Sequence, residues 1–380
     1  MYLMKPLLYI VFIFTLYACI EPYEPDIEGY ENLLVVDGLI TNQAGPYQIR
    51  LTRSFPYKGG TEKLETEATV KVKDINNKEY IFEEITGGTY QNIDESFIGE
   101  IGNSYKLSIV TVEGNIYESD YEDLKKPIPI DTIYYQFKSN EYNDITGLQI
   151  FIDTHDDENK TWYYGWTYSE TWEIRTPYIL YYTAAASRPR RQVCYSNAVS
   201  NELLIGSSSN NTKDILKMQP VYFINYDNNR LRYTYSGLIK QYTLNEKSYT
   251  YLKELKKINE EGGTLYDASP ASLNGNIHNI THSEEPVLGI FQVSGITEKR
   301  IFIKNEEVPL NGIIPTGFED CENVLVPIGD TITIDSLLNK EFMVIMDTLS
   351  EPTRLEFASS IVCFDCIYSG SFIKPYFWPE

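Results

Sequence analysis

Residues 105–119, YKLSIVTVEGNIYES, contain the pattern that decides the fold class. Apolar and polar side chains alternate over 105–112 and again over 116–119, as in strands that bury one face. Glu113-Gly114-Asn115 lies between the two segments, and a glycine between polar residues is typical of a hairpin turn. The stretch therefore predicts two antiparallel strands.

Similar short segments precede this hairpin in the chain. They lie at residues 33–40, 47–52, 68–74 and 80–82, separated by turn residues such as those of 42–46 (NQAGP). Gly38, inside the first segment, predicts a β-bulge. About seven short strands within roughly 95 residues are typical of an immunoglobulin-like β-sandwich. We expect this sandwich over residues 31–126.

Residues 125–130, KKPIPI, mark a domain boundary because their prolines favour an extended linker over a paired strand. Strand patterns resume beyond it, at residues 131–137, 147–153, 162–172, 287–293, 300–304 and 342–346. The fold class is therefore predicted as mainly β, with a larger β-rich domain over residues 127–380.

One amphipathic surface helix is expected in that domain, near residues 246–261. Its apolar residues, spaced three apart, are Tyr249, Leu252, Leu255 and Ile258. Lys and Glu side chains cover the opposite face. Asn245 is a favourable N-cap, and Gly262-Gly263 ends the run.

Residues 1–18 have the features of a lipoprotein signal peptide. Lys5 precedes the apolar run 7–18, whose 12 residues would form a helix of about 18 Å, too short for a hydrocarbon core of roughly 30 Å. Residues 16–19, LYAC, match a bacterial lipobox, although Tyr17 is bulkier than usual. We therefore expect lipidation of Cys19 followed by an acidic tether over 19–30. The alternative is an ordinary secretory signal with an incidental cysteine.

The charge of the chain limits its partners. The formal net charge is −22, and it becomes −23 without residues 1–18, which contain one charged residue, Lys5. Such a charge argues against binding to nucleic acid or to anionic lipid surfaces. Tyrosine is abundant, with 32 residues, and this residue favours strands.

Four cysteines remain after Cys19, and an even number in an exported chain predicts two disulfides. They are Cys194, Cys321, Cys363 and Cys366. Half of a zinc site and a redox pair are the alternatives for Cys363-x-x-Cys366, but neither a second close pair nor a thioredoxin-like pattern accompanies it. Because a loop closed between Cys363 and Cys366 would be strained, we expect each to pair with Cys194 or Cys321. The sequence does not choose between the two arrangements.

Several motifs occur in a characteristic order along the chain. They are 34–41 (LVVDGLIT), 233–244 (YTYSGLIKQYTL), 263–276 (GTLYDASPASLNGN), 286–291 (PVLGIF), 363–366 (CFDC) and 374–379 (KPYFWP). From the lipobox to the last residues, the chain resembles the Bacteroidetes lipoprotein family defined by the domain of unknown function 4249. The resemblance implies an outer-membrane lipoprotein that accompanies a TonB-dependent transporter. It assigns no catalytic or binding residue.

Two polar clusters are candidates for metal binding. His278-x-x-x-His282 has the spacing of a zinc-binding helix, but Asn279 stands where that motif needs glutamate, and Gly275-Asn276 disfavours a helix. The loop 153–159 (DTHDDEN) offers several carboxylates for calcium, although the order of an EF-hand is missing. We expect histidines in a loop and a polar turn, and therefore no metal and no cofactor.

Two further clusters are candidates for binding. The aromatic residues of even number within 162–172 would share one face of a strand, which favours core packing over a ligand-stacking platform. These residues are Trp162, Tyr164, Trp166, Tyr168 and Trp172. Arg188, Arg190 and Arg191 form the one basic cluster of this acidic chain, and they are either a solvated loop or a contact for an acidic partner.

No sequence motif of a hydrolase or nucleotide-binding enzyme is present, so no catalytic residue is assigned and we expect no enzymatic activity. The first hypothesis is a non-catalytic lipoprotein that helps a TonB-dependent β-barrel capture or admit its ligand. The alternatives are an extracytoplasmic hydrolase and a structural envelope protein. Acidic residues after Cys19 resemble a surface-export signal, so we expect the outer membrane, facing the cell exterior.

Overall fold

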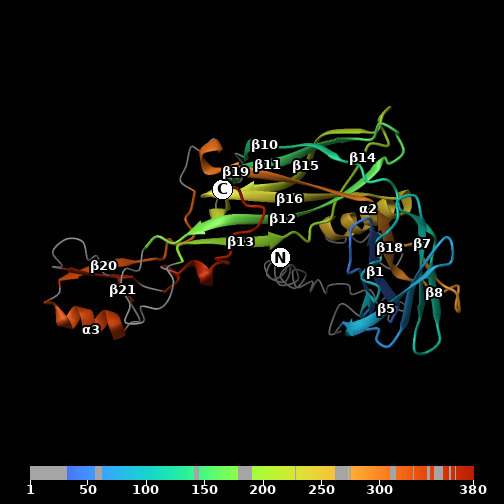
Figure 1. Ribbon diagram of the computed structural model, residues 1–380, viewed down its shortest axis with the longest axis horizontal. Helices are drawn as coiled ribbons and strands as arrows, with labels where there is room; N and C mark the ends of the chain where they lie inside the picture. The colour runs from blue at the N-terminus through green and yellow to red at the C-terminus, as the bar shows by residue number, and fades with distance from the viewer. Residues whose placement is uncertain are drawn as a thin grey trace, which may run out of the picture.

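The computed structural model describes residues 32–55, 62–140, 145–178, 191–226, 228–261, 273, 275–308, 314–327, 329–339, 343–345, 354–358, 361–363 and 365–380. Strands dominate these residues, so the predicted mainly β fold is confirmed. Figure 1 shows three parts: a curled sheet, a larger pair of sheets, and a small sheet beside a helix.

The first part is one sheet of 11 strands in the order β17-β8-β7-β4-β5-β6-β2-β1-β18, with β3 beside β2 and β9 beside β7. The strands are β1 (Leu34–Thr41), β2 (Gln48–Arg53), β3 (Lys63–Leu64), β4 (Thr69–Asp74), β5 (Glu79–Thr86), β6 (Thr89–Asn92), β7 (Ser104–Val110), β8 (Ile116–Ser119), β9 (Glu122–Asp123), β17 (Ile277–Asn279) and β18 (Leu288–Ser294). Alternate side chains of β2, β4 and β7 are buried in one core. The predicted sandwich is thus built as a single sheet that curls into a nearly closed barrel, and not as two separate sheets. The predicted hairpin is confirmed, because β7 and β8 pair antiparallel.

Two strands of this barrel come from far along the chain. β18 pairs parallel with β1, from Val35 opposite Leu288 to Thr41 opposite Ser294, and β17 pairs antiparallel with β8. The predicted domain 31–126 is therefore incomplete, because its sheet needs backbone partners from residues 277–294. The boundary at 126 and 127 marks only the first passage of the chain out of the barrel.

Gly38 does not form the predicted bulge, since pairing with β18 continues without a shift past Gly38, and pairing with β2 reaches Gly38 in register. A Cβ atom at this position would lie 3.2 Å from Ile49 and 3.3 Å from Phe291. Close packing of these neighbouring side chains, rather than backbone irregularity, accounts for the glycine.

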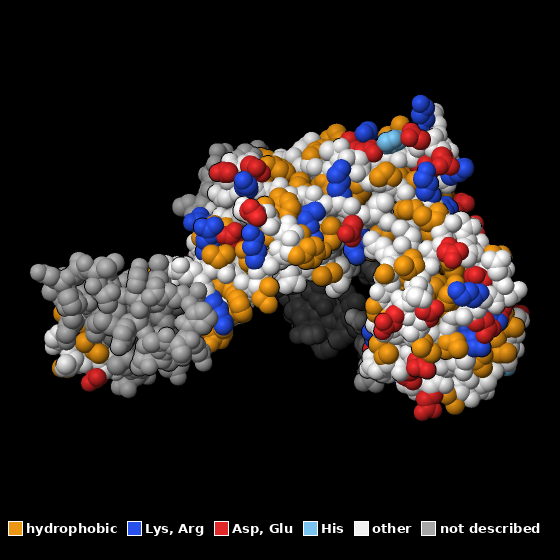
Figure 2. All heavy atoms as spheres, in the orientation of Figure 1, with side chains coloured by type: hydrophobic (Ala, Val, Ile, Leu, Met, Phe, Trp, Pro, Cys, Tyr) orange, Lys and Arg blue, Asp and Glu red, His pale blue; other side chains and the backbone are white. Residues whose placement is uncertain are grey.

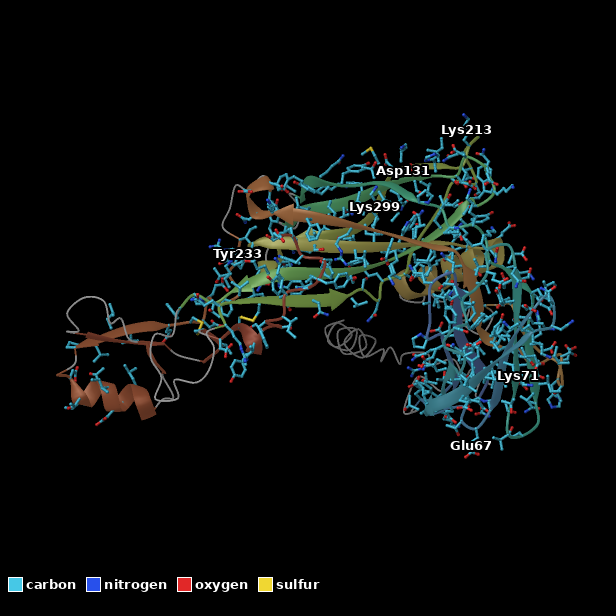
Figure 3. The ribbon with its side chains drawn as sticks, in the orientation of Figure 1. Glu67, Lys71, Asp131, Lys213, Tyr233 and Lys299 are labelled. Carbon is cyan, nitrogen blue, oxygen red and sulfur yellow. A yellow bond between two sulfur atoms is a disulfide. The ribbon has the colours of Figure 1, made fainter. Side chains whose placement is uncertain are left out.

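The second part is a sandwich of two sheets that share one core. One sheet has the order β10-β11-β15, and the other has the order β13-β12-β16-β19 with β14 also paired to β12. The strands are β10 (Ile130–Asn140), β11 (Ile145–His155), β12 (Tyr163–Arg175), β13 (Val193–Val199), β14 (Leu204–Ser207), β15 (Ile215–Asn225), β16 (Thr234–Thr243) and β19 (Ile296–Lys304). The edge strands β10 and β19 meet where Lys299 Nζ donates to the Ile130 carbonyl at 3.2 Å (Figure 3). The sandwich is closed on that side.

The predicted helix is present as α2 (Glu246–Glu261). It lies at the junction of the two parts, because its Tyr251 hydroxyl accepts from the N–H of Gly289 in β18 and its Tyr249 ring stacks on Tyr163. Among the described residues, no helix has the length and apolar character needed to cross a membrane.

The third part contains elements that the sequence patterns did not predict, apart from one strand. Its small sheet comprises β20 (Asn323–Pro327), β21 (Met343–Ile345) and β22 (Arg354–Ala358), with helix α3 (Thr331–Asn339) beside it. Helix α3 is thus present in addition to the predicted α2. Short 3-10 helices are η1 (Asn229–Leu231), η3 (Asn305–Glu307), η4 (Ile361–Cys363) and η5 (Cys366–Tyr368).

Near the junction of the first two parts, two asparagine side chains hydrogen-bond to both the N–H and the carbonyl of one residue, as a neighbouring strand would. Fully buried Asn276 accepts from the N–H of Phe291 at 3.0 Å, and its amide donates to the Phe291 carbonyl and to Glu122. Burial raises the pKa of Glu122. Asn42 makes the same two backbone hydrogen bonds with Ile296, but it is only half-buried.

We expect Asn276→Ala to lower the free energy of unfolding by about 3 kcal/mol, because buried donors and acceptors lose their partners and water cannot replace them. Asn42→Ala is the matched control, with an expected loss of about 1 kcal/mol because water can reach that site. Urea unfolding of the non-lipidated mature protein would measure both. Equal losses would contradict the argument from burial.

Candidate functional site

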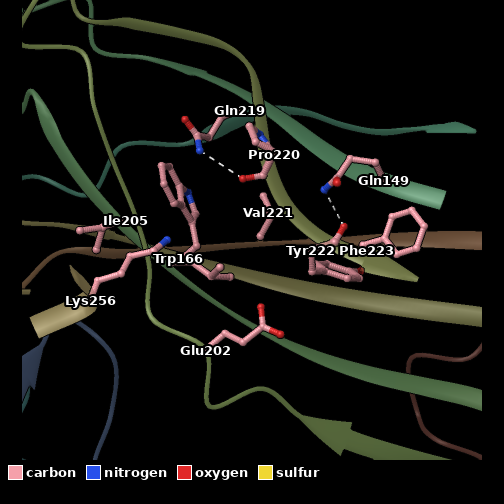
Figure 4. Close-up of a pocket in the computed structure, with 11 residues that line it drawn as sticks. Gln149, Trp166, Glu202, Ile205, Gln219, Pro220, Val221, Tyr222, Phe223 and Lys256 are labelled. Carbon is pink, nitrogen blue, oxygen red and sulfur yellow. Dashed lines mark hydrogen bonds between the residues drawn. The ribbon is translucent and has the colours of Figure 1, made fainter. Parts of the chain in front are cut away.

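The second part carries a cleft on its open side, where one sheet ends at β15 and the other at β13 and β14. Two adjoining pockets of about 400 and 490 Å³ form this cleft and share the side chains of Glu202 and Phe223. Figure 4 shows the first pocket, into which Lys256 extends from α2. Each volume lies within the range of ligand-binding pockets.

Aromatic side chains from both sheets line the cleft. Tyr168 of β12 stacks on Tyr222 of β15, with ring centres 3.9 Å apart and planes 10° from parallel. Trp166 lines the first pocket, and its indole N–H donates to Gln241 at 2.8 Å. Phe223 lines both pockets. Such walls suit a ligand with flat or apolar groups that stack on them.

A buried polar network supports the second pocket. Glu170, which is 3% exposed, forms an ion pair with Arg230 and accepts from the Tyr235 hydroxyl at 2.8 Å. The hydroxyls of Tyr235 and Tyr222 lie 3.0 Å apart. The guanidinium of Arg230 also lies 5.0 Å from the centre of the Trp172 ring. Arg230 is therefore held at the cleft wall by a carboxylate and an aromatic face.

Burial controls the ionisation of the tyrosines in this network. It raises the pKa of Tyr168, of Tyr222 and of Tyr235. These hydroxyls therefore stay neutral at physiological pH. Tyr235 donates its single proton to Glu170, so Tyr222 donates to Tyr235. The cleft thus offers its aromatic faces, the guanidinium of Arg230 and the exposed carboxylate of Glu202.

The parity prediction for the aromatic run is confirmed within β12. Tyr164 and Trp166 are buried in the shared core, and Tyr168 and Trp172 pack against it. Trp162 is the exception, because it precedes β12 and has a φ of 59°, so strand alternation does not apply to it. The same face of β12 contributes to the core and to the cleft, since Trp166 and Tyr168 also line the pockets.

Glu170, Glu202 and Arg230 were not among the predicted site residues. Glu170 shares the even parity of the aromatic residues of β12, so a carboxylate on an apolar face was a usable signal for a buried ion pair. Arg230, by contrast, lies in η1, where Asn228 accepts from its backbone N–H. No local pattern connects it with β12.

Of the acidic segment 153–159, residues 153–155 end β11, and residues 156–159 form the expected polar turn between β11 and β12. The Asp156 carboxylate accepts from the backbone N–H groups of Glu158, Lys160 and Thr161 at 2.9 to 3.1 Å. Hydrogen bonds from Lys160 and Lys126 lower the pKa of Glu158 to about 2. The Asp156 carboxylate thus serves the turn itself, and the Asp153 carboxylate accepts from Lys217 and from the N–H of Met218 in β15. No described residues form a cluster of three or more metal-ligating side chains.

The histidines lie apart from the cleft. His278 is in β17 and contacts Asp120 at 3.2 Å, and His282 follows that strand. The pair is therefore not on a helix, but His278 lies in a strand and not in the expected loop, because its backbone pairs with β8. His155 contacts Asp131 at 2.7 Å, and this hydrogen bond raises its pKa.

The cysteines form two disulfides, as predicted, and each member of the CxxC motif has a distant partner. Cys194 of β13 pairs with Cys366, and Cys321 pairs with Cys363; the Cα separations are 5.6 and 5.8 Å. Figure 3 shows both bonds where the third part meets the second. Cys19, Arg188 and Arg190 lie outside the described residues. Arg191 is described, and its guanidinium lies 4.3 Å from the centre of the Phe372 ring.

Comparison with known proteins places the chain in a family. The family model described as "Domain of unknown function (DUF4249)" matches residues 20–300, which include the barrel and nearly all of the second part. No curated protein matches the chain. The motifs at 363–366 and 374–379 lie beyond the matched residues. Since the family model covers more than half of the sequence, the predicted membership is confirmed, and the protein belongs to the DUF4249 family.

Proposed function

We propose that the protein is a non-catalytic, lipid-anchored binding protein of the outer membrane, facing the cell exterior, and an accessory subunit of a TonB-dependent transporter. It holds a ligand in the cleft of its second part and presents that ligand to the β-barrel of the transporter. The lipobox at Cys19 and the resemblance described above support the anchor and the partner. The cleft is the observation that carries the binding role.

The chemistry of the cleft favours binding over turnover. Stacked rings and neutral hydroxyls recognise a ligand without reacting with it, and Glu170 is occupied by Arg230 and Tyr235. A carboxylate held in an ion pair is a poor general base, because pairing stabilises its charged form. In the described part of the chain, His155 and His278 are paired with aspartates and lie away from these groups.

We expect Phe223→Ala to weaken ligand binding about tenfold, because the shared aromatic wall of both pockets is lost and one good stacking contact is worth about 1.4 kcal/mol. Quenching of the tryptophan fluorescence, to which Trp166 in the first pocket contributes, would be followed in the Cys19→Ala protein against mixed oligopeptides and mixed oligosaccharides. Phe137→Ala is the matched control, because this aromatic residue lies in β10 of the same sheet and outside the cleft.

The same samples distinguish binding from hydrolysis. Mass spectrometry of the mixtures after incubation should show the added compounds unchanged. Release of shorter fragments, dependent on the protein and abolished in Phe223→Ala, would support the hydrolase alternative and contradict the proposal. An equal loss of quenching in Phe137→Ala would remove the cleft as the binding site.

A further inference from the structure

Large apolar side chains lie on the surface near the end of the chain. Tyr368, Phe372, Ile373 and Tyr376 are 53%, 52%, 67% and 98% exposed. We refer to these four residues as the C-terminal patch. Single exposed apolar residues are common on protein surfaces, but four within nine residues form a cluster of the kind that marks an interaction site.

The fold holds this segment firmly in place. The disulfide of Cys366 attaches it to β13, and the backbones of Ser371 and Tyr195 exchange two hydrogen bonds of 2.8 and 2.9 Å. Beyond the patch, Trp378 is 8% exposed and packs edge-on against Tyr195. The patch residues are therefore exposed because the segment is fixed over the outer side of β13, not because the segment is loose.

Cations accompany the aromatic residues of this segment. Arg191 lies over Phe372, and Arg300 lies 3.5 Å from the centre of the Phe377 ring. Lys374 falls between the patch residues in sequence. Of the two acidic residues in 365–380, Asp365 uses its carboxylate to cap Ile367. Arg191, Arg300 and Lys374 thus accompany Asp365 and Glu380, whereas acidic residues outnumber basic ones by 54 to 32 in the whole chain. This segment with its two neighbouring arginines is therefore less acidic than the rest of the protein, over whose surface Figure 2 shows both charge types interspersed.

This composition fits a protein partner. Aromatic side chains and arginine are the residues that contribute most at the centres of protein interfaces. An anionic lipid surface fits less well, because the remaining charge of the protein would oppose adsorption. Positive groups beside an apolar patch are complementary to an apolar partner surface bordered by carboxylates.

We propose that the C-terminal patch is the surface with which this protein docks on the β-barrel of the TonB-dependent transporter. The docking surface of the transporter is then apolar and bordered by acidic side chains. The inference rests on the proposed accessory role. It assigns Arg191 to the rim of the interface, packed on Phe372, and the exposed aromatic residues to its centre.

The test compares two triple variants of the full-length, lipidated protein. One is Phe372→Ser, Ile373→Ser and Tyr376→Ser. The control is Ile75→Ser, Ile85→Ser and Ile101→Ser. These three residues lie in the first part of this protein and are 53% to 56% exposed. An affinity tag inserted in the β7–β8 turn stays away from the C-terminal segment. Captured TonB-dependent barrels are identified by mass spectrometry and quantified.

We expect the patch variant to capture at least about tenfold less of the TonB-dependent transporter than the wild type, because it lacks the hot-spot residues of the interface. The control variant should capture as much as the wild type. Tyr376→Ser alone should also reduce capture, and its side chain is too exposed to support the fold. In a purified pair, Arg191→Ala should slow association and flatten its salt dependence.

The outcomes separate this inference from the proposed function. If the wild type captures a barrel and the patch variants capture it equally well, the patch is not the docking surface and the accessory role stands. A wild type that captures no barrel overturns the accessory role and the inference with it. Equal losses in the patch and control variants would also overturn the inference.

Discussion

Replacing Cys19 with alanine is expected to move the mature protein from the membrane fraction to the soluble fraction. A lipidated Cys19 would carry three acyl chains, and each buried CH₂ group contributes about 0.8 kcal/mol, which is enough for stable attachment. Residues 7–18 are too short to replace this anchor by spanning the bilayer. In the described residues, no helix provides a span either.

Fractionation after detergent-free lysis, combined with the intact mass of each fraction, would measure this effect. The mass distinguishes the cleaved protein from a precursor that is retained by its signal peptide. Glu21→Ala is a suitable control, because it changes the acidic tether and leaves the lipobox intact. A Cys19→Ala protein that is cleaved after residue 18 and still sediments with membranes would contradict the anchoring argument.

Local patterns predicted most elements of the first two parts. Strand β8 has the predicted bounds, and α2 covers the predicted residues 246–261. Both successes rest on periodicity, because burial of one face sets a period of two in strands and of 3.6 in helices. Local patterns have no access to pairing between distant segments. The return of β17 and β18 to the barrel was therefore not predicted.

Helix α3 shows how a cap can outweigh intrinsic propensity. Its sequence, TITIDSLLN, begins with β-branched residues, which favour strands. Asp330, however, accepts from the N–H of Thr333 at 3.1 Å and from its hydroxyl, so a free donor of the first turn is satisfied. The hydroxyl hydrogen bond also lowers the pKa of Asp330.

The cleft was out of reach of sequence reasoning because it forms between two sheet edges. Glu202 follows β13, Phe223 lies in β15, and Arg230 follows β15 in η1. Only the tertiary arrangement of the two sheets brings these residues together. The aromatic run of β12 was recognised, but its use in both the core and the cleft became clear only when the open side of the sandwich was known.

Removing the disulfide between Cys194 and Cys366 is expected to have the largest effect on stability. The two cysteines are 172 residues apart, and the chain-entropy model gives a loss of about 5 kcal/mol for a closed loop of that length. Both sulfurs are buried, and the bond connects the C-terminal segment to β13. The double variant Cys194→Ser and Cys366→Ser avoids a free thiol that would exchange with the second disulfide.

Cys321→Ser with Cys363→Ser is the matched control, because it removes the other disulfide. That loop spans only 42 residues, so the same model gives about 4 kcal/mol, and the loss should be confined to the third part. Hydrogen exchange would separate the two variants. The first should expose the amides of Tyr195 and Ser371, which bond each other across the segment, and the second should leave them protected.

The two variants also connect stability with docking. If the bond at Cys366 holds the C-terminal patch in place, the first variant should lose barrel capture and the second should retain it. Urea unfolding, hydrogen exchange and capture can be measured on the same preparations. Equal protection of Ser371 in both variants would show that the β13 pairing holds the segment without the disulfide, and capture by the first variant should then persist.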